Sequence, residues 1–156
     1  MKQFSQPLLH GLLGAALCAL CLFGIYSYDS ILVTGPTFFL CFPIAIAAMY
    51  MSGIQSRKSN GGYISFPLAF RSVLITGVLS FSGLYLMQLI LFTSDPQLIE
   101  YLHQLDLERF SGPQSEMEDI PAIELNIRYL LRYFTRAFGV SLIFTLIVSL
   151  IVKRTK

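Results

Sequence analysis

Residues 72–94 read SVLITGVLSFSGLYLMQLILFTS and contain no charged side chain. A run of about 20 apolar residues in an α-helix is long enough to cross the hydrocarbon core of a bilayer. Working outward from this run, three further stretches of similar character appear on either side of it. We therefore predict four membrane-spanning helices, at residues 8–28, 33–55, 69–93 and 133–152.

The composition of the 156-residue chain agrees with this prediction. Apolar residues make up 54 % of the sequence, charged residues only 13 %, and the mean hydropathy is +0.65. A water-soluble domain of this size needs far more polar surface, so that class is excluded. The expected fold is all-α: one polytopic membrane domain over residues 1–156, with four transmembrane helices and an external segment at 94–132. The first helix is expected to stay in the mature protein, because no A-x-A-like cleavage site follows it.

The charged residues sort onto two sides of this four-span layout. One side holds no acidic residue and seven cations, which are Lys2, Arg57, Lys58, Arg71, Lys153, Arg154 and Lys156. The other side holds nine acidic residues and four arginines, so the two net charges are +7 and −5. By the positive-inside rule, both termini and the loop from Arg57 to Arg71 are predicted to be cytoplasmic. The overall charge of +2 therefore does not indicate a nucleic-acid partner.

Small residues and prolines indicate how the helices pack. Small residues four apart predict close helix contacts, within one chain rather than between copies, although a homo-oligomer is compatible with them. They are Gly11, Gly14, Ala15, Cys18 and Ala19 in the first span and Thr76, Gly77, Ser80, Ser82 and Gly83 in the third. Pro36 is expected near the start of the second helix, and Pro43 is expected to kink it, which would either shape a cavity or simply curve the helix. No span shows a polar stripe, so a channel is not expected.

The external segment contains the only long polar region. The sequence predicts an amphipathic helix from Pro96 to Arg109, a turn-rich stretch to Pro121, and then a helix that continues into the fourth span. Three arginines, Arg128, Arg132 and Arg136, recur every four residues and so lie on one helical face. Their predicted partners are either the carboxylates of the same segment or the phosphates of anionic lipid.

No constellation of catalytic or metal-binding residues is recognisable. Cys18, Cys21 and Cys41 lie within apolar runs and are interpreted as packing residues, and the two histidines, His10 and His103, fall on opposite sides of the membrane. No hydrolase, zincin or nucleotide-loop motif occurs, so we expect neither a cofactor nor an enzyme.

The polar loop before the third span is the most distinctive stretch. Asn60-Gly61-Gly62 predicts a tight turn with positive φ, whereas Tyr63, Phe66 and Arg71 are predicted to anchor the chain at the membrane interface. A family resemblance rests on residues 57–66, on Ala69-Phe70, Gly77 and Ser82-Gly83, and on Asp95-Pro96.

On these residues the chain resembles an uncharacterised bacterial membrane family, domain of unknown function four-one-nine-nine. The resemblance implies a four-span inner-membrane protein of Gram-negative bacteria, with an accessory role beside a membrane-associated family-two glycosyltransferase. Pro67 departs from the family pattern.

Two functions therefore compete. The first is a non-catalytic accessory or scaffold protein that docks a partner such as a glycosyltransferase through a cytoplasmic loop. The residues assigned to this docking loop are Arg57, Lys58, Gly61, Gly62, Tyr63, Phe66 and Arg71. The second is an anionic-lipid-binding or transport protein that uses the external arginines 128, 132 and 136, together with a cavity at Pro43.

Overall fold

The computed structural model describes residues 2–34, 36–98, 100–101 and 127–153. Its regular elements are all helices: α1 (Lys2–Tyr28), η1 (Ser30–Thr34), η2 (Pro36–Cys41), α2 (Phe42–Ser59), α3 (Phe66–Ser94) and α5 (Ile127–Val152). The all-helical prediction is thus confirmed for the described residues. Residues 96–98 and 100–101 are also helical, which agrees with a helix that starts at Pro96; the remainder of the predicted amphipathic helix lies outside the described residues.

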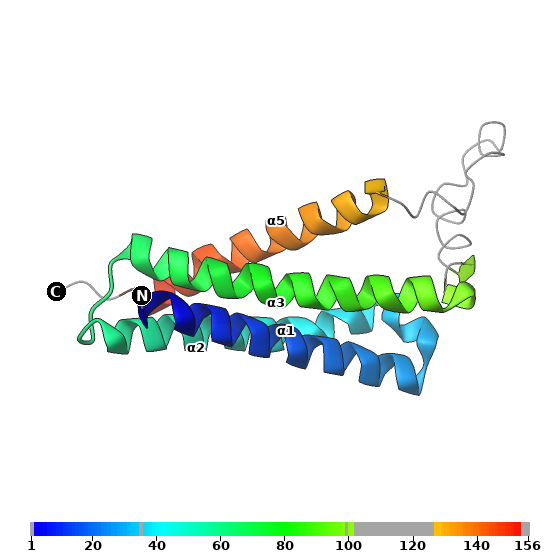
Figure 1. Ribbon diagram of the computed structural model, residues 1–156, viewed down its shortest axis with the longest axis horizontal. Helices are drawn as coiled ribbons and strands as arrows, with labels where there is room; N and C mark the ends of the chain where they lie inside the picture. Colours follow the sequence, from blue (N-terminus) through cyan, green and yellow to red (C-terminus); the bar gives the residue numbers. More distant parts are fainter. Residues whose placement is uncertain (1, 35, 99, 102–126, 154–156) are drawn as a thin grey trace.

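The four long helices run alternately up and down (Figure 1). The start of α1, the connection from α2 to α3 and the end of α5 lie at one end of the bundle. We call this the basic end, because Arg57, Lys58, Arg71 and Lys153 belong to it. The opposite end, where Asp29 and Asp95 follow α1 and α3, is called the acidic end.

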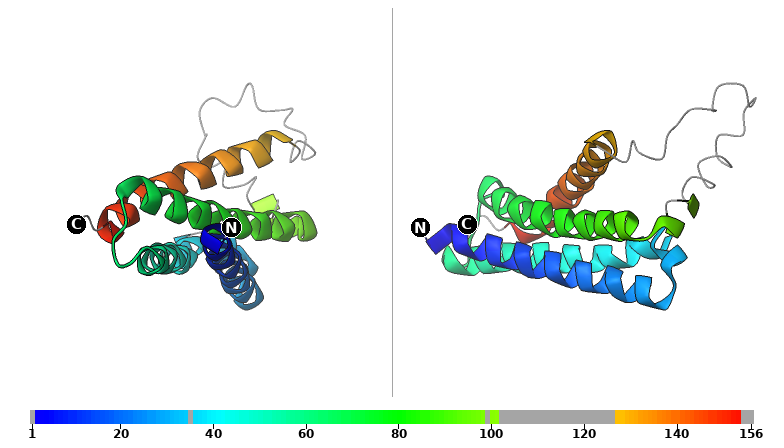
Figure 2. Two further views of the ribbon diagram at one scale, coloured as in Figure 1. Left: turned by 60° about the vertical axis from the view of Figure 1, so that its left-hand side comes forward. Right: turned by 45° about the vertical axis from the view of Figure 1, so that its right-hand side comes forward.

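The helices do not form an evenly packed bundle. Helices α1, α2 and α3 lie together along their length, with α1 on α3 as the most extensive contact. Helix α5 contacts α3 and α2 near its C-terminal end and diverges from them toward its start, as all three views show (Figures 1 and 2). Phe144 of α5 marks this contact, because its ring stacks on Phe81 of α3 and meets Phe42 of α2 edge-on.

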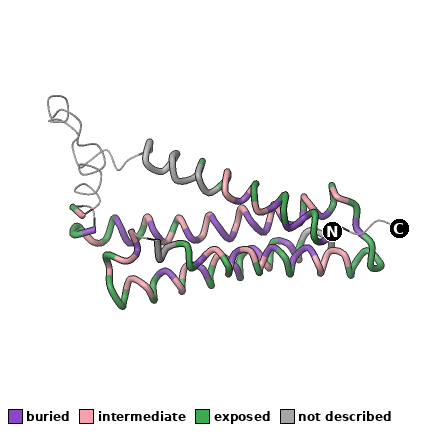
Figure 3. Tube along the Cα trace, turned by 180° about the vertical axis from the view of Figure 1, so that it is seen from behind, coloured by how far each residue is buried: buried purple, intermediate pink, exposed green. Residues whose placement is uncertain are grey.

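The distribution of side chains is that of a protein surrounded by lipid. The leucines of α1 from Leu8 to Leu20 are about half exposed or more, up to 66 % at Leu20, whereas Ser80 and Thr145 are completely buried. Figure 3 shows the exposed residues along the outer faces of the helices and the buried ones between them. Exposed apolar side chains around a partly polar interior are favourable only where the surroundings are apolar.

Three helices are long and apolar enough to cross a membrane. They are Ser5–Tyr28, Phe39–Ser59 and Phe66–Ser94, which contain most of the first three predicted spans. The fourth predicted span coincides with α5, whose apolar part, Phe138–Val152, is a shorter segment. The structure therefore establishes three candidate spans.

The predicted small-residue face of α1 packs within the chain. A Cβ atom added to Gly11 would lie 2.8 Å from Cβ of Leu79, and one added to Gly83 would lie 2.8 Å from Cα of Ala15. The Thr76 and Ser80 hydroxyls of α3 approach α1 carbonyl oxygens, at 3.0 Å from Pro7 O and 3.4 Å from Gly11 O. Small residues let two backbones approach this closely, so the prediction of an intramolecular face is confirmed.

The prediction for Pro43 is wrong. Residues 36–41 form the 3-10 helix η2, and α2 begins only at Phe42, so Pro43 occupies the first turn. The amide of a first-turn residue has no partner within its own helix, and a proline there causes no kink. Pro43 is exposed and does not line the cavity described below.

The prediction that no span carries a polar stripe is also wrong. Polar side chains recur every fourth residue on the buried face of α3, at Ser72, Thr76 and Ser80, with Gln88 two turns further on. A second buried set lies on α5, at Ser141, Thr145 and Ser149. The bundle therefore has a polar interior column, although hydroxyls this small do not interrupt the apolar appearance of the sequence.

Candidate functional site

A glycine turn ends α2 and shapes the loop at the basic end. The Gly62 amide donates to the Arg57 carbonyl at 3.0 Å, and the Gly61 amide donates to the Lys58 carbonyl at 3.2 Å. These are the two hydrogen bonds of a Schellman motif, and they require a left-handed residue just past the helix. Gly61 and Gly62 supply it, with φ of 71° and 87°. The predicted positive-φ turn is thus confirmed.

The residues after the turn are held in place. The side chain of Ile64 is only 3 % exposed and belongs to the hydrophobic core, and Pro67 lies in the first turn of α3. Buried Ile64 therefore fixes the path of the loop, while Lys58 and Tyr63 remain exposed on either side of the glycines.

The predicted docking residues differ in their exposure and in their contacts. Arg57 is half-buried, and its guanidinium donates to the carbonyl of Val152 at 3.5 Å, which connects α2 to the end of α5. The ring of Phe66 packs against Phe70 on the next turn of α3, with centroids 5.8 Å apart. Arg71 belongs to the cavity described below.

A chain of hydroxyl groups lies behind the loop, between α1, α2 and α3. Ser56 Oγ is 2.6 Å from Ser72 Oγ, which is 3.1 Å from Ser52 Oγ. The Thr76 hydroxyl continues the chain, 2.8 Å from Ser52 Oγ and 3.0 Å from the Pro7 carbonyl oxygen. Hydrogen bonds between helices satisfy polar groups that lipid cannot.

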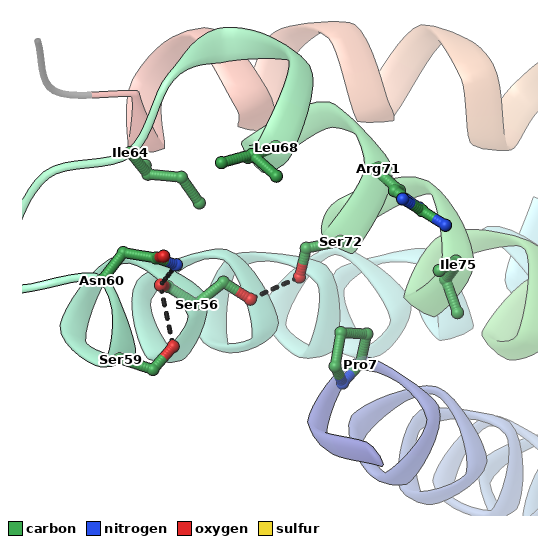
Figure 4. A pocket seen from close by; sticks show the side chains of 9 residues that line it. All are labelled: Pro7, Ser56, Ser59, Asn60, Ile64, Leu68, Arg71, Ser72 and Ile75. Atoms are coloured by element: carbon green, nitrogen blue, oxygen red, sulfur yellow. Dashed lines mark hydrogen bonds between the residues drawn. The ribbon is translucent and has the colours of Figure 1, made fainter. Parts of the chain in front are cut away.

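The outer end of this hydroxyl chain opens onto a cavity of about 60 Å³. Figure 4 shows the Ser56 and Ser72 hydroxyls directed toward each other, Arg71 and Ile75 on successive turns of α3, and Pro7 facing them from α1. Asn60 and Ser59 both donate to the Ser56 carbonyl, at 2.7 and 3.0 Å. The cavity is lined by Pro7, Ser56, Ser59, Asn60, Ile64, Leu68, Arg71, Ser72 and Ile75.

Sequence reasoning placed Arg71 in a loop but missed its neighbours. Ser56 and Pro7 lie far from it in the sequence, and only the packing of α1 and α2 on α3 brings them together. The one available signal was the spacing of Ser52, Ser56, Ser72 and Thr76 by four residues within each helix.

At the acidic end, Asp95 performs two structural tasks. Its Oδ2 accepts from the Tyr26 hydroxyl at 3.1 Å, and its Oδ1 accepts from the Gln97 amide at 3.0 Å. The first bond joins the ends of α1 and α3, and the second caps the helical residues that follow Pro96. Asp95 thus caps a helical segment in which Pro96 occupies the first turn, where a proline is well tolerated.

The three arginines that the sequence predicts to be external belong to the first turns of α5. Because α5 is continuous from Ile127, positions 128, 132 and 136 share one side of its backbone, as the four-residue spacing predicted. Their side chains, and the acidic residues from 106 to 124, lie outside the described residues.

The cysteines pack in the interior, as the sequence predicted. Cys18 and Cys41 are buried, all three thiols are free, and Cys18 Sγ donates to the Cys41 carbonyl at 3.5 Å. Within the described residues, no group of three metal-ligating side chains occurs.

These features define an all-helical membrane protein with three candidate spans, a polar interior and a small polar cavity at its basic end. The chain belongs to the family described as Protein of unknown function (DUF4199), whose sequence model matches residues 9–154. The resemblance seen in the sequence is thus confirmed. No curated protein and no solved structure matches the chain.

Proposed function

We propose that α5 is a fourth membrane span and that the basic end faces the cytoplasm of a bacterium, from the inner membrane. Two observations support this topology: α5 runs antiparallel to α3, and its apolar residues pack against α2 and α3. The basic end carries cations without acidic residues, which is the pattern of a cytoplasmic face. Both termini are then cytoplasmic, and residues 94–132 are external.

We further propose that the protein is a non-catalytic accessory or scaffold subunit that docks a membrane-associated partner through its cytoplasmic loop. The observation that carries this proposal is the fixed loop at the basic end. The Schellman turn and buried Ile64 hold the backbone, so that Lys58 and Tyr63 are presented without a backbone ordering cost on binding. Exposed aromatic and cationic side chains on a rigid support are typical of binding surfaces.

The partner fits a protein with an acidic patch at the membrane surface, and a membrane-associated glycosyltransferase is the candidate. Most of the remaining described surface is apolar and faces lipid, which leaves the basic end as the main polar docking area. Complementary charge would orient the partner during its encounter with the loop.

Affinity purification from the native membrane in mild detergent tests the docking proposal. The double variant Lys58→Glu/Tyr63→Ala should lose a partner that the wild-type chain retains in stoichiometric amount. Tyr28→Ala is the matched control, because Tyr28 is 88 % exposed at the acidic end. Recovery of the wild-type chain without any protein partner, or equal recovery of the partner by the double variant, would contradict the proposal.

The second candidate function is binding or transport of an anionic lipid through the arginines of α5. The continuity of α5 favours it, since positions 128, 132 and 136 then share one side of the backbone of a single helix, at the proposed external boundary. Neutralising Arg132 and Arg136 to Gln should abolish retention of anionic lipid while the protein stays folded. Lys153→Gln, at the other end of the same helix, serves as the control; unchanged lipid retention in the folded double variant would exclude this function.

A further inference from the structure

We propose that the cavity at the basic end is a phosphate-binding site, which takes the phosphate of an anionic phospholipid headgroup or free phosphate. The lining of the cavity contains one cationic residue, Arg71 of α3, and the hydroxyl of Ser56; the side chains of Ser59 and Asn60 donate to the Ser56 carbonyl, and Arg71 extends away from them along the other side of the cavity (Figure 4). Guanidinium and hydroxyl donors around a small opening are the groups that recognise phosphate oxygens.

The position of the cavity suits a headgroup. It lies between the last turn of α2, which ends at Ser59, and the first turns of α3, which begins at Phe66. These are the limits of two candidate membrane spans, so the cavity lies at headgroup depth whichever way the bundle faces. Leu68 and Ile75 complete its wall with apolar surface suited to the start of an acyl chain.

Charge also favours an anionic ligand. The sequence has no Asp or Glu between residues 30 and 94 or between residues 125 and 156, so every residue lining the cavity is neutral or cationic. Arg57, Lys58 and Lys153 add positive potential at the same end of the bundle. A concave site with charge of one sign concentrates ions of the opposite sign.

The hydroxyl chain gives the cavity a donor. The chain contains four hydroxyl groups but only three hydrogen bonds between them. Three of the four hydroxyl protons are therefore used within the chain, and one is left to be donated elsewhere. The shortest contact of the Thr76 hydroxyl is with Ser52 Oγ, at 2.8 Å. When Thr76 donates there, Ser52 donates to Ser72 and Ser72 to Ser56, which leaves the Ser56 proton to be donated to an oxygen in the cavity. A chain of this kind strengthens each of its hydrogen bonds.

In the alternative direction the Thr76 hydroxyl donates to a carbonyl oxygen, that of Pro7 at 3.0 Å or that of Ser72 at 3.2 Å. Each hydroxyl then donates its hydrogen bond toward the interior of the bundle, and the Ser56 oxygen can only accept a hydrogen bond at the cavity. An incoming phosphate oxygen therefore selects the outward direction. This links the occupied cavity to the contact between Thr76 and Pro7, which joins α3 to α1.

The test uses the purified full-length chain and measures bound species by native mass spectrometry. Phosphatidylglycerol in mixed detergent micelles is one probe, and inorganic phosphate is the other. Arg71→Gln removes the guanidinium and its charge but keeps a shorter polar side chain, and we expect it to weaken phosphatidylglycerol binding about tenfold, as loss of a charge-assisted hydrogen bond does. Lys58→Gln is the matched control: it removes one cation of the same end but does not line the cavity.

A second variant tests the cavity itself without a change in charge. Leu68 is half-exposed at the rim of the cavity, and Leu68→Trp replaces its side chain by a larger, aromatic one. This variant should weaken binding to a similar extent. Binding of phosphatidylglycerol but not of inorganic phosphate would identify a lipid headgroup site, and the reverse would identify a site for free phosphate.

Three outcomes would overturn the proposal: no binding of either probe by the wild-type chain, equal weakening by Arg71→Gln and Lys58→Gln, or full binding by Leu68→Trp. None of these outcomes depends on a protein partner. The site can therefore fail while the docking function stands, and the reverse also holds.

Discussion

The contact between Gly83 of α3 and Ala15 of α1 makes the most direct prediction about stability. A Cβ atom at position 83 would approach Cα of Ala15 to 2.8 Å. Ordinary contacts between carbon atoms begin near 3.5 Å. Because the obstacle is backbone, no side-chain rotation can relieve the overlap, and in the Gly83→Ala variant α1 and α3 must move apart.

The cost follows from the size of this displacement. Helices separated by about 0.5–1 Å lose roughly a quarter to a half of their dispersion energy along the contact, and overpacked interiors are typically destabilised by about 1–3 kcal/mol. The better helix propensity of alanine returns at most about 1 kcal/mol. We therefore expect Gly83→Ala to lower the free energy of unfolding by about 1–2 kcal/mol, which for a chain of this size lowers the Tm by about 2–8 °C.

The protein contains its own reporters for this measurement. Cys18 and Cys41 are buried free thiols, so a thiol-reactive fluorophore added during heating in detergent reports the opening of the bundle. Gly24→Ala is the matched control, because a Cβ atom at this position on α1 meets nothing within 4 Å. A Gly83→Ala transition that coincides with those of the wild type and Gly24→Ala would refute the close contact between α1 and α3.

Three further predictions use the same thermal assay. Tyr26→Phe should lower the Tm slightly through loss of the hydrogen bond to Asp95, and should have no further effect in an Asp95→Ala background. Gly61→Ala should cost about 1–2 kcal/mol because φ is 71° there, whereas Gly61→Asn should cost less; equal costs would show that the turn does not need a left-handed residue. Thr76→Val should cost about 1–3 kcal/mol because it interrupts the buried hydroxyl chain, and the exposed Thr93→Val serves as the control that should stay near wild type.

Local sequence signals predicted the features that depend on one helix at a time. Uncharged runs predicted the ends of α1 and α3, and the spacing of Gly11 and Ala15 predicted a close packing face. Asn60-Gly61-Gly62 predicted the turn, because only particular residues accept the left-handed backbone that ends α2. In these cases the physical constraint and the residues that satisfy it lie within a few positions of each other.

Features that depend on several helices were missed or misread. Pro43 is compatible with both a kink and a first turn, and the choice depended on where the 3-10 helix η2 ends, at Cys41. The cavity combines residues of α1, α2 and α3, so no single stretch of sequence could indicate it. The spacing of Thr76 and Ser80 predicted a packing face on α3, but the extension of this face to Ser72 and its link to Ser52 and Ser56 of α2 depend on how the two helices pack.

The register between α1 and α3 limits how the molecule can move. Pro7 pairs with Thr76, Gly11 with Ser80 and Tyr26 with Asp95, and in each pair the two residues are separated by 69 positions. Sliding one helix along the other by a single turn, about 5.4 Å, would break all three pairs together. Helices α1 and α3 are therefore expected to move together as one rigid unit. Helix α5 contacts the bundle mainly near its C-terminal end, so we expect its N-terminal part to change its angle to α1 and α3 more easily.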